Sequence, residues 1–299
     1  MKKSIKSVLT IIAFSLFLSL IPSGRLKAEG IPEVGSPEYE LLFSEVYVIP
    51  EDFEFNVSVE NTTYMGLQTI FFNSDTESDT TIFYIHGGSF IAQPLEEHLG
   101  FADRLALSSK AEVIMPIYPL APKHQYQETF DDLLILYTAY ITENPDRKVI
   151  LAGDSAGANI ALCLSQRIRD LGIDMPYKLV LISPWADLTL TNPFISLYPD
   201  AAVGVPIMQV AASWWCGETD PSDPSVSPLF ADLTGLPQTY IIEGTSDYLY
   251  PDVVILADNM KAAGCKVKLL LSGGLTHSFP VMYYQYCGEE ILSIARFCK

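Results

Sequence analysis

Short apolar runs alternate with segments of helical spacing from about residue 80 to the end of the chain, and no other feature constrains the fold as strongly. Continuous apolar runs of this length predict strands buried on both faces, as in a parallel sheet. Helical segments between such strands predict an α/β fold, with a mostly parallel central sheet flanked by helices. The predicted strands cover residues 68–72, 81–86, 111–118, 148–153, 178–183, 239–243 and 266–271, and the predicted helices cover 127–141, 157–170, 252–263 and 289–297.

A long connection interrupts this alternation between residues 190 and 228. A structureless connection of that length is unusual in a compact domain, so we expect an insertion that packs over one end of the sheet. Residues 208–216 within it, which include Trp214 and Trp215, have helical character. Residues 29–66 also fall outside the alternation, because they are acidic and irregular.

The N-terminal segment has the layout of an export signal. Three lysines precede an apolar run at 8–21, which is short for a membrane span of about 20 residues. We therefore expect residues 1–28 to be a signal peptide and residues 29–299 to form the mature, secreted protein. Leu26 stands where a cleavage site prefers a small residue, so an uncleaved anchor that leaves the protein outside the membrane is the alternative.

The charge of the chain argues against two classes of partner. The net charge is −18, and removal of residues 1–28, with five basic side chains and no acidic ones, makes it −23. Such a surface repels phosphate backbones and anionic headgroups. We expect no nucleic-acid partner and no membrane contact beyond the possible anchor, while the oligomeric state stays open.

The five cysteines do not form a recognisable framework. None is paired with C-x-x-C spacing, and the histidines are not placed to complete a zinc site, so we expect no metal. Cys163 lies in an apolar helical segment and is expected to be a buried thiol. One disulfide is possible after export, with Cys265, Cys287 and Cys298 as the candidates.

The strongest local signal for chemistry is a G-x-S-x-G pattern at Gly153, Asp154, Ser155, Ala156 and Gly157. It follows an apolar run and opens a helical segment, and a serine in that position projects its hydroxyl from a sharp turn. The two glycines leave room where the turn brings backbone close together. The amide of Ala156, at the helix N-terminus, is placed to stabilise an oxyanion. The alternative is a glycine-rich turn without chemistry.

A serine nucleophile needs a base, and only four histidines are available. His98 lies in a polar helical segment and is expected at the surface, while His124 lies in a turn where a structural role is expected. His86 precedes the serine at the end of an early strand. His277 lies in a loop after the last predicted strand, where it can reach Ser155, so by elimination it is the predicted base.

The third group of a triad must orient the imidazole and stabilise its charged form. Asp247 follows the predicted strand 239–243 and gives the chain order serine, aspartate, histidine. Asp252 is the competitor, but its place in the first turn of a helix fits a role in starting that helix.

A second glycine-rich turn begins at His86 and continues through Gly87, Gly88 and Ser89. It follows an early strand, and in hydrolases of this topology the loop at that place supplies a backbone N–H that stabilises the oxyanion together with the amide of Ala156. Glycine at these positions lets the backbone approach a substrate carbonyl closely. Alone the turn is a weak signal, but together with the serine turn it becomes specific.

At this point the sequence resembles the hormone-sensitive-lipase-like, H-G-G-G-type esterases of the α/β-hydrolase superfamily, over about residues 80–299. The segments that carry the resemblance are H-G-G-S-F at 86–90, Y-P-L-A-P-K-H at 118–124, G-D-S-A-G-A-N at 153–159, S-P-W-A-D-L-T at 183–189, D-Y-L at 247–249 and H-S-F at 277–279.

The resemblance implies an α/β-hydrolase core with a small helical cap built from about 29–66 and 190–228. It also implies hydrolysis of small esters with short to medium acyl groups, without a metal or organic cofactor. The family's oxyanion donors carry over to the amides of Gly88, Ser89 and Ala156. Three departures are visible, because Ser89 replaces a glycine, Pro119 replaces an arginine and Lys123 replaces an acid.

Two other functions remain open from the sequence. A peptidase or amidase would use the same triad on another bond, and nothing in the sequence excludes it. A small-molecule binding protein on a hydrolase scaffold is the non-catalytic alternative, although such proteins usually lack a triad residue.

Overall fold

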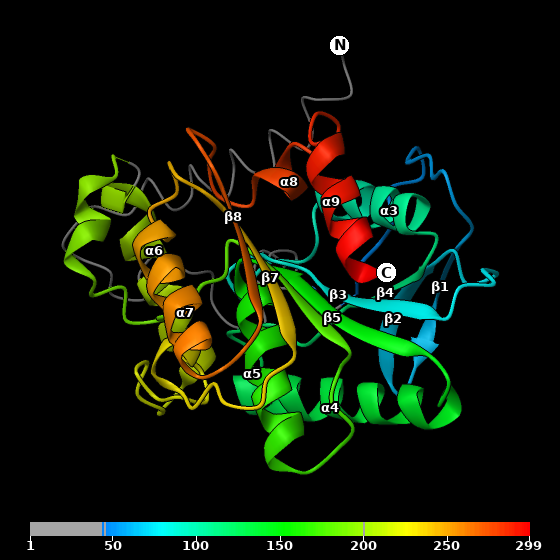
Figure 1. Cartoon of the computed structure of the whole chain (residues 1–299), viewed down its shortest axis with the longest axis horizontal. Helices are drawn as coiled ribbons and strands as arrows, with labels where there is room; N and C mark the ends of the chain where they lie inside the picture. Colours follow the sequence, from blue (N-terminus) through cyan, green and yellow to red (C-terminus); the bar gives the residue numbers. More distant parts are fainter. Residues whose placement is uncertain (1–43, 45, 200) are drawn as a thin grey trace.

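The computed structural model describes residues 44, 46–199 and 201–299 (Figure 1). The predicted signal peptide or anchor at 1–28 lies outside the described residues and stays a prediction. Within the ranges that the structure describes, no helix combines the length and the apolar character that a membrane crossing requires.

One sheet of eight strands forms the centre of the molecule, in the order β1-β2-β4-β3-β5-β6-β7-β8. The pairs from β4 through β8 are parallel, whereas β1 and β2 pair antiparallel with each other and β2 with β4. The predicted, mostly parallel sheet is therefore confirmed. The strands are β1 (Val59–Tyr64), β2 (Leu67–Phe72), β3 (Thr80–Ile85), β4 (Glu112–Pro116), β5 (Lys148–Asp154), β6 (Lys178–Ile182), β7 (Gln238–Gly244) and β8 (Val267–Ser272).

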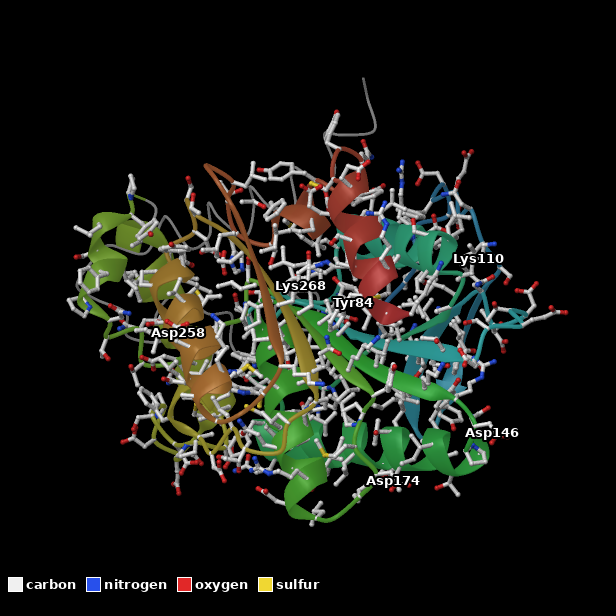
Figure 2. All side chains as sticks on the ribbon, viewed as in Figure 1. Tyr84, Lys110, Asp146, Asp174, Asp258 and Lys268 are labelled. Carbon is white, nitrogen blue, oxygen red and sulfur yellow. The ribbon has the colours of Figure 1, made fainter. Side chains whose placement is uncertain are left out.

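Helices cover both faces of the sheet (Figure 1). One layer holds α3 (Glu96–Ser109), α8 (Phe279–Met282) and α9 (Gly288–Cys298), and the other holds α4 (Tyr126–Glu143), α5 (Ala156–Asp170), α6 (Ala201–Cys216) and α7 (Tyr250–Ala262). Side chains alternate between the layers along each strand: Phe83 packs with the α4 and α5 layer, and Tyr84 packs with the α3 and α9 layer. Tyr84, labelled in Figure 2, is fully buried in that second layer.

The end of the predicted cap segment at 29–66 belongs to the sheet instead of a cap. This part of the 29–66 segment contains β1, an edge strand of the sheet, which a tight turn at Met65 and Gly66 joins to β2. Both turn residues have positive φ, as a two-residue hairpin turn requires. Four of the six β1 residues are exposed, so the strand carries no apolar pattern that would have announced it.

The insertion at 190–228 packs beside the loop that follows β3. It contains the short 3₁₀ helix η2 (Pro193–Leu197) and α6, and a second 3₁₀ helix, η3 (Pro228–Phe230), follows it. The predicted helix at 208–216 is the second half of α6. The indole of Trp215 on α6 stacks on Phe90, with ring centroids 4.5 Å apart.

All five cysteines lie in the described part of the chain, and all are buried free thiols. The expected burial of Cys163 is confirmed, but the possible disulfide is not formed. Cys287 and Cys298 lie at opposite ends of α9, about 16 Å apart along a helix of that length. Cys265 packs in the core layer on the other side of the sheet, so none of these pairs meets disulfide geometry.

Candidate active site

Ser155 occupies the turn between β5 and α5, which begins at Ala156. Its backbone has φ 53° and ψ −119°, a strained combination for a residue with a side chain. A Cβ on Gly153 would lie 2.4 Å from the backbone of Gly157, and one on Gly157 would lie 2.0 Å from the carbonyl oxygen of Ile85. The glycines of the pattern are thus required by close backbone approach, as predicted.

The structure brings together the three side chains that the sequence assigns to a triad. Nε2 of His277 lies 2.8 Å from Oγ of Ser155, and Nδ1 of His277 lies 2.5 Å from Oδ2 of Asp247. Ser155 is 6% exposed and the Asp247 side chain is fully buried, whereas the His277 side chain is 34% exposed. The site therefore reaches solvent at its imidazole.

The His277–Asp247 contact shifts the pKa of both groups. Burial acts to lower the pKa of His277, but the charge and hydrogen bond of Asp247, with the charge of Asp154, outweigh it and raise that pKa. Burial acts to raise the pKa of Asp247, but the charge and hydrogen bond of His277 and the Leu249 amide lower it overall. Asp247 is therefore an ionised partner that favours the protonated imidazole.

Asp252 does not compete for the imidazole. It accepts a hydrogen bond of 2.6 Å from the side chain of Asn192, at the start of η2, and so connects α7 to the insertion. Burial raises the pKa of Asp252 to about 6, with the charge of Asp187 adding to the effect and the Asn192 bond opposing it. This contact agrees with the prediction that Asp252 is not the acid of the triad, while its role in starting α7 stays a prediction.

Three backbone amides are free to receive an oxyanion. Within the described residues, the N–H groups of Gly88, Ser89 and Ala156 donate to no other protein group. Gly88 has φ 125°, and a Cβ there would lie 2.7 Å from the carbonyl oxygen of Ala92, so a glycine is required. Ser89, in place of the family's glycine, adopts φ 54°.

Asp154 supports the loop that carries these amides. Its Oδ1 accepts hydrogen bonds from the Gly87 amide at 2.8 Å and from the Tyr84 hydroxyl at 2.7 Å. A Cβ on Gly87 would lie 2.5 Å from Oδ2 of Asp154, so the glycine lets loop and carboxylate meet. The residue before the serine therefore connects the two predicted halves of the site.

His98 is a buried partner of Asp154, and its predicted surface position is wrong. The Nδ1 atom accepts from the Leu95 amide at 2.9 Å, so Nε2 carries the hydrogen and faces Oδ2 of Asp154 at 3.6 Å. The side chain is on the face of α3 that packs against the sheet. The burial of His98 could not be predicted from the sequence of α3, because polar residues lie on the buried face of this helix as well as on its exposed face.

His86 holds the glycine-rich loop rather than acting as a base. Its Nδ1 lies 2.7 Å from the Gly87 carbonyl oxygen, which can only accept, and its ring stacks on Tyr118. The Tyr118 hydroxyl donates to the backbone oxygen of His86. Burial and the neighbouring His98 lower the pKa of His86 to about 3, so the imidazole stays neutral.

One buried acid near the site was missed by the sequence reasoning. Glu243 lies at the end of β7, is 0% exposed, and contacts Asp247 four residues later. The apolar pattern predicts only that Glu243 ends a strand, and its charged side chain is the one feature that sets it apart from its neighbours there.

Comparisons with known proteins agree on the family. A family model described as an α/β-hydrolase fold matches residues 82–281. An esterase of Acinetobacter venetianus is 35% identical over 222 residues, which cover 72% of this chain and 73% of that protein. An acetyl-hydrolase of Streptomyces hygroscopicus is 32% identical over 194 residues, 62% of this chain and 64% of that protein. A solved hormone-sensitive lipase from a metagenome library is 27% identical, with a TM-score of 0.77 and coverage of 96% and 97%.

Proposed function

This chain belongs to the hormone-sensitive-lipase-like esterases of the α/β-hydrolase superfamily, and we propose that it hydrolyses small carboxylic esters through Ser155 and an acyl-enzyme intermediate. The observation that carries the proposal is the continuous contact from Ser155 through His277 to Asp247. A base within hydrogen-bonding reach of a hydroxyl, itself oriented by a carboxylate, is the arrangement that nucleophilic acyl transfer needs.

In the first half of the reaction, His277 removes the proton of Ser155 as the oxygen attacks the ester carbonyl. The amides of Gly88, Ser89 and Ala156 stabilise the oxyanion, and His277 then delivers the proton to the leaving alcohol. In the second half, His277 activates a water molecule that attacks the acyl-enzyme, and Ser155 is released. Asp247 stabilises the imidazolium in both halves.

A short to medium acyl chain is supported by the aromatic packing beside the loop. Phe90, one residue after Ser89, stacks on Trp215 and on Trp185, with ring centroids 4.5 and 5.2 Å apart. All three side chains are fully buried, and they fill the space next to the oxyanion loop. We propose that these rings form one wall of the acyl site and limit the length of the acyl chain that it accepts.

The proposal is tested by Ser155→Ala on p-nitrophenyl acetate and butyrate, beside the matching anilides. We expect the substitution to lower kcat by about 10⁴-fold or more, because the nucleophile is lost. Wild-type protein should cleave esters faster than anilides and should be labelled at Ser155 by a fluorophosphonate.

Faster cleavage of the anilides would identify an amidase. Absence of labelling together with undiminished turnover in Ser155→Ala would reject the serine mechanism, and absence of both labelling and turnover in the wild type would favour a binding protein.

A further inference from the structure

Glu243 is a buried acid without a positively charged partner. Its side chain is fully buried at the carboxyl end of β7, and it makes no ion pair with any lysine, arginine or histidine of the described residues. A buried, uncompensated carboxylate is unfavourable, and such a group takes up a proton instead. Its neighbourhood identifies where that proton lies.

The two oxygens of Glu243 have different surroundings. Oε1 accepts hydrogen bonds from the Gly244 amide at 2.7 Å and from the Ser183 hydroxyl at 3.1 Å. Oε2 is buried and receives no donor from the described part of the protein. The proton therefore belongs on Oε2.

The carboxyl group of Asp247 is the acceptor available to that proton. Asp247 lies four residues after Glu243, and each of the two carboxyl groups acts on the pKa of the other through a direct side-chain interaction. Asp247 already accepts from the Leu249 amide at 2.9 Å and from His277 at 2.5 Å, as an ionised carboxylate does. Of the two acids, Glu243 is therefore the one that carries the proton.

We infer that Glu243 is a positioning residue of the proposed active site, whose protonated carboxyl group donates from Oε2 to Asp247 and holds that carboxylate against His277. This inference rests on the proposed function. Burial, the charge of Asp247 and the contact with it raise the pKa of Glu243 well above its ordinary value. The other titratable groups near the pair are His277, on the far side of Asp247, and Tyr198 at the end of η2.

Ser183 extends this support to the histidine loop. Its hydroxyl donates to Oε1 of Glu243 and accepts a 3.0 Å hydrogen bond from the amide of Ser278. Ser278 is the residue after His277, so Glu243 is connected both to the acid and, through Ser183, to the base. A neutral acid gives this support without adding a second negative charge beside Asp247.

The test compares Glu243→Gln with Glu243→Met through the pH dependence of kcat/KM on p-nitrophenyl butyrate. Glutamine keeps an acceptor for Ser183 and Gly244 and a donor for Asp247, whereas methionine keeps only the size. We expect Glu243→Gln to stay within about threefold of wild type and Glu243→Met to lose on the order of 10- to 100-fold in kcat, because Asp247 is no longer held.

The low-pH limb of the kcat/KM profile shows whether Glu243 is neutral or ionised. If Glu243 is neutral, Glu243→Gln leaves the midpoint of this limb unchanged. If Glu243 is ionised, the same substitution removes a negative charge near His277 and lowers the midpoint by about one pH unit or more, which would overturn the inference. Full activity of Glu243→Met would overturn it as well.

An infrared difference spectrum of wild type minus Glu243→Gln at pH 7 gives an independent measurement. We expect the carbonyl stretch of a protonated carboxylic acid in the wild type, and its absence would overturn the inference even if Glu243→Met does not fold. Fluorophosphonate labelling of Ser155 in the wild type distinguishes failure of this inference from failure of the proposed function. Labelled protein with an ionised Glu243 rejects only the inference about Glu243. Wild-type protein that is neither labelled nor active rejects the proposed function.

Discussion

Two buried acids flank the candidate site, Asp154 beside the serine and Glu243 beside Asp247, and their pKa values move in opposite directions. Burial acts to raise the pKa of both. Around Asp154, the interaction with His98 and the hydrogen bonds from Tyr84 and Gly87 outweigh burial, so the pKa falls. Around Glu243, the charge of Asp247 adds to burial, so the pKa rises. The donors that surround a buried acid, rather than its depth, decide whether it is charged.

The largest expected effect is at Asp247, the neighbour of Glu243: Asp247→Asn should lower kcat by about 10⁴-fold. An amide removes the charge that stabilises the imidazolium and favours the wrong tautomer of His277. Steady-state kinetics on a p-nitrophenyl ester measures the loss. The matched control is Asp252→Asn, five residues later, which should keep kcat within about threefold because Asp252 contacts Asn192 instead. Equal losses in both variants would contradict the assignment.

A smaller effect is expected on the Asp154 side, where His98→Leu should lower the free energy of unfolding by about 1–3 kcal/mol. The substitution leaves Oδ2 of a buried, charged carboxylate without its facing donor. Chemical denaturation with urea measures the change. His124→Leu is the control, since His124 is paired with an exposed Glu128 and should cost about 1 kcal/mol or less. A His98→Leu protein as stable as the control would show that Asp154 does not need this partner.

The smallest expected effect is a shift in pH dependence. The pKa of His277 is raised, so its protonated, inactive form persists above the ordinary histidine value near 6.5. Activity should therefore fall as the pH drops through a midpoint that lies above 6.5, measured as kcat/KM against pH. Asp154→Asn should lower this midpoint, because the charge of Asp154 contributes to the shift. A wild-type midpoint at or below 6.5 would be inconsistent with the described contacts.

The sequence predicted the parallel sheet and the meeting of Ser155, Asp247 and His277, because both follow from local rules. Apolar runs mark buried strands, and loops after parallel strands share one edge of the sheet. The supporting residues were not predictable in this way. His98 lies among polar residues of α3 and Glu243 lies at the end of an apolar strand, and only tertiary packing shows what faces each of them. The edge strand β1 was not predicted because most of its residues are exposed, and an exposed strand carries no apolar pattern.

The stacking of Phe90 on Trp215 connects the insertion at 190–228 to the loop that carries two of the proposed oxyanion amides. Phe90 follows Ser89, and Trp215 lies on α6 in the insertion, outside the central sheet. A change in α6 that moved the indole would also move the aromatic ring next to an oxyanion amide. We therefore expect substitutions in α6 that alter the proposed substrate site to alter the proposed oxyanion site as well.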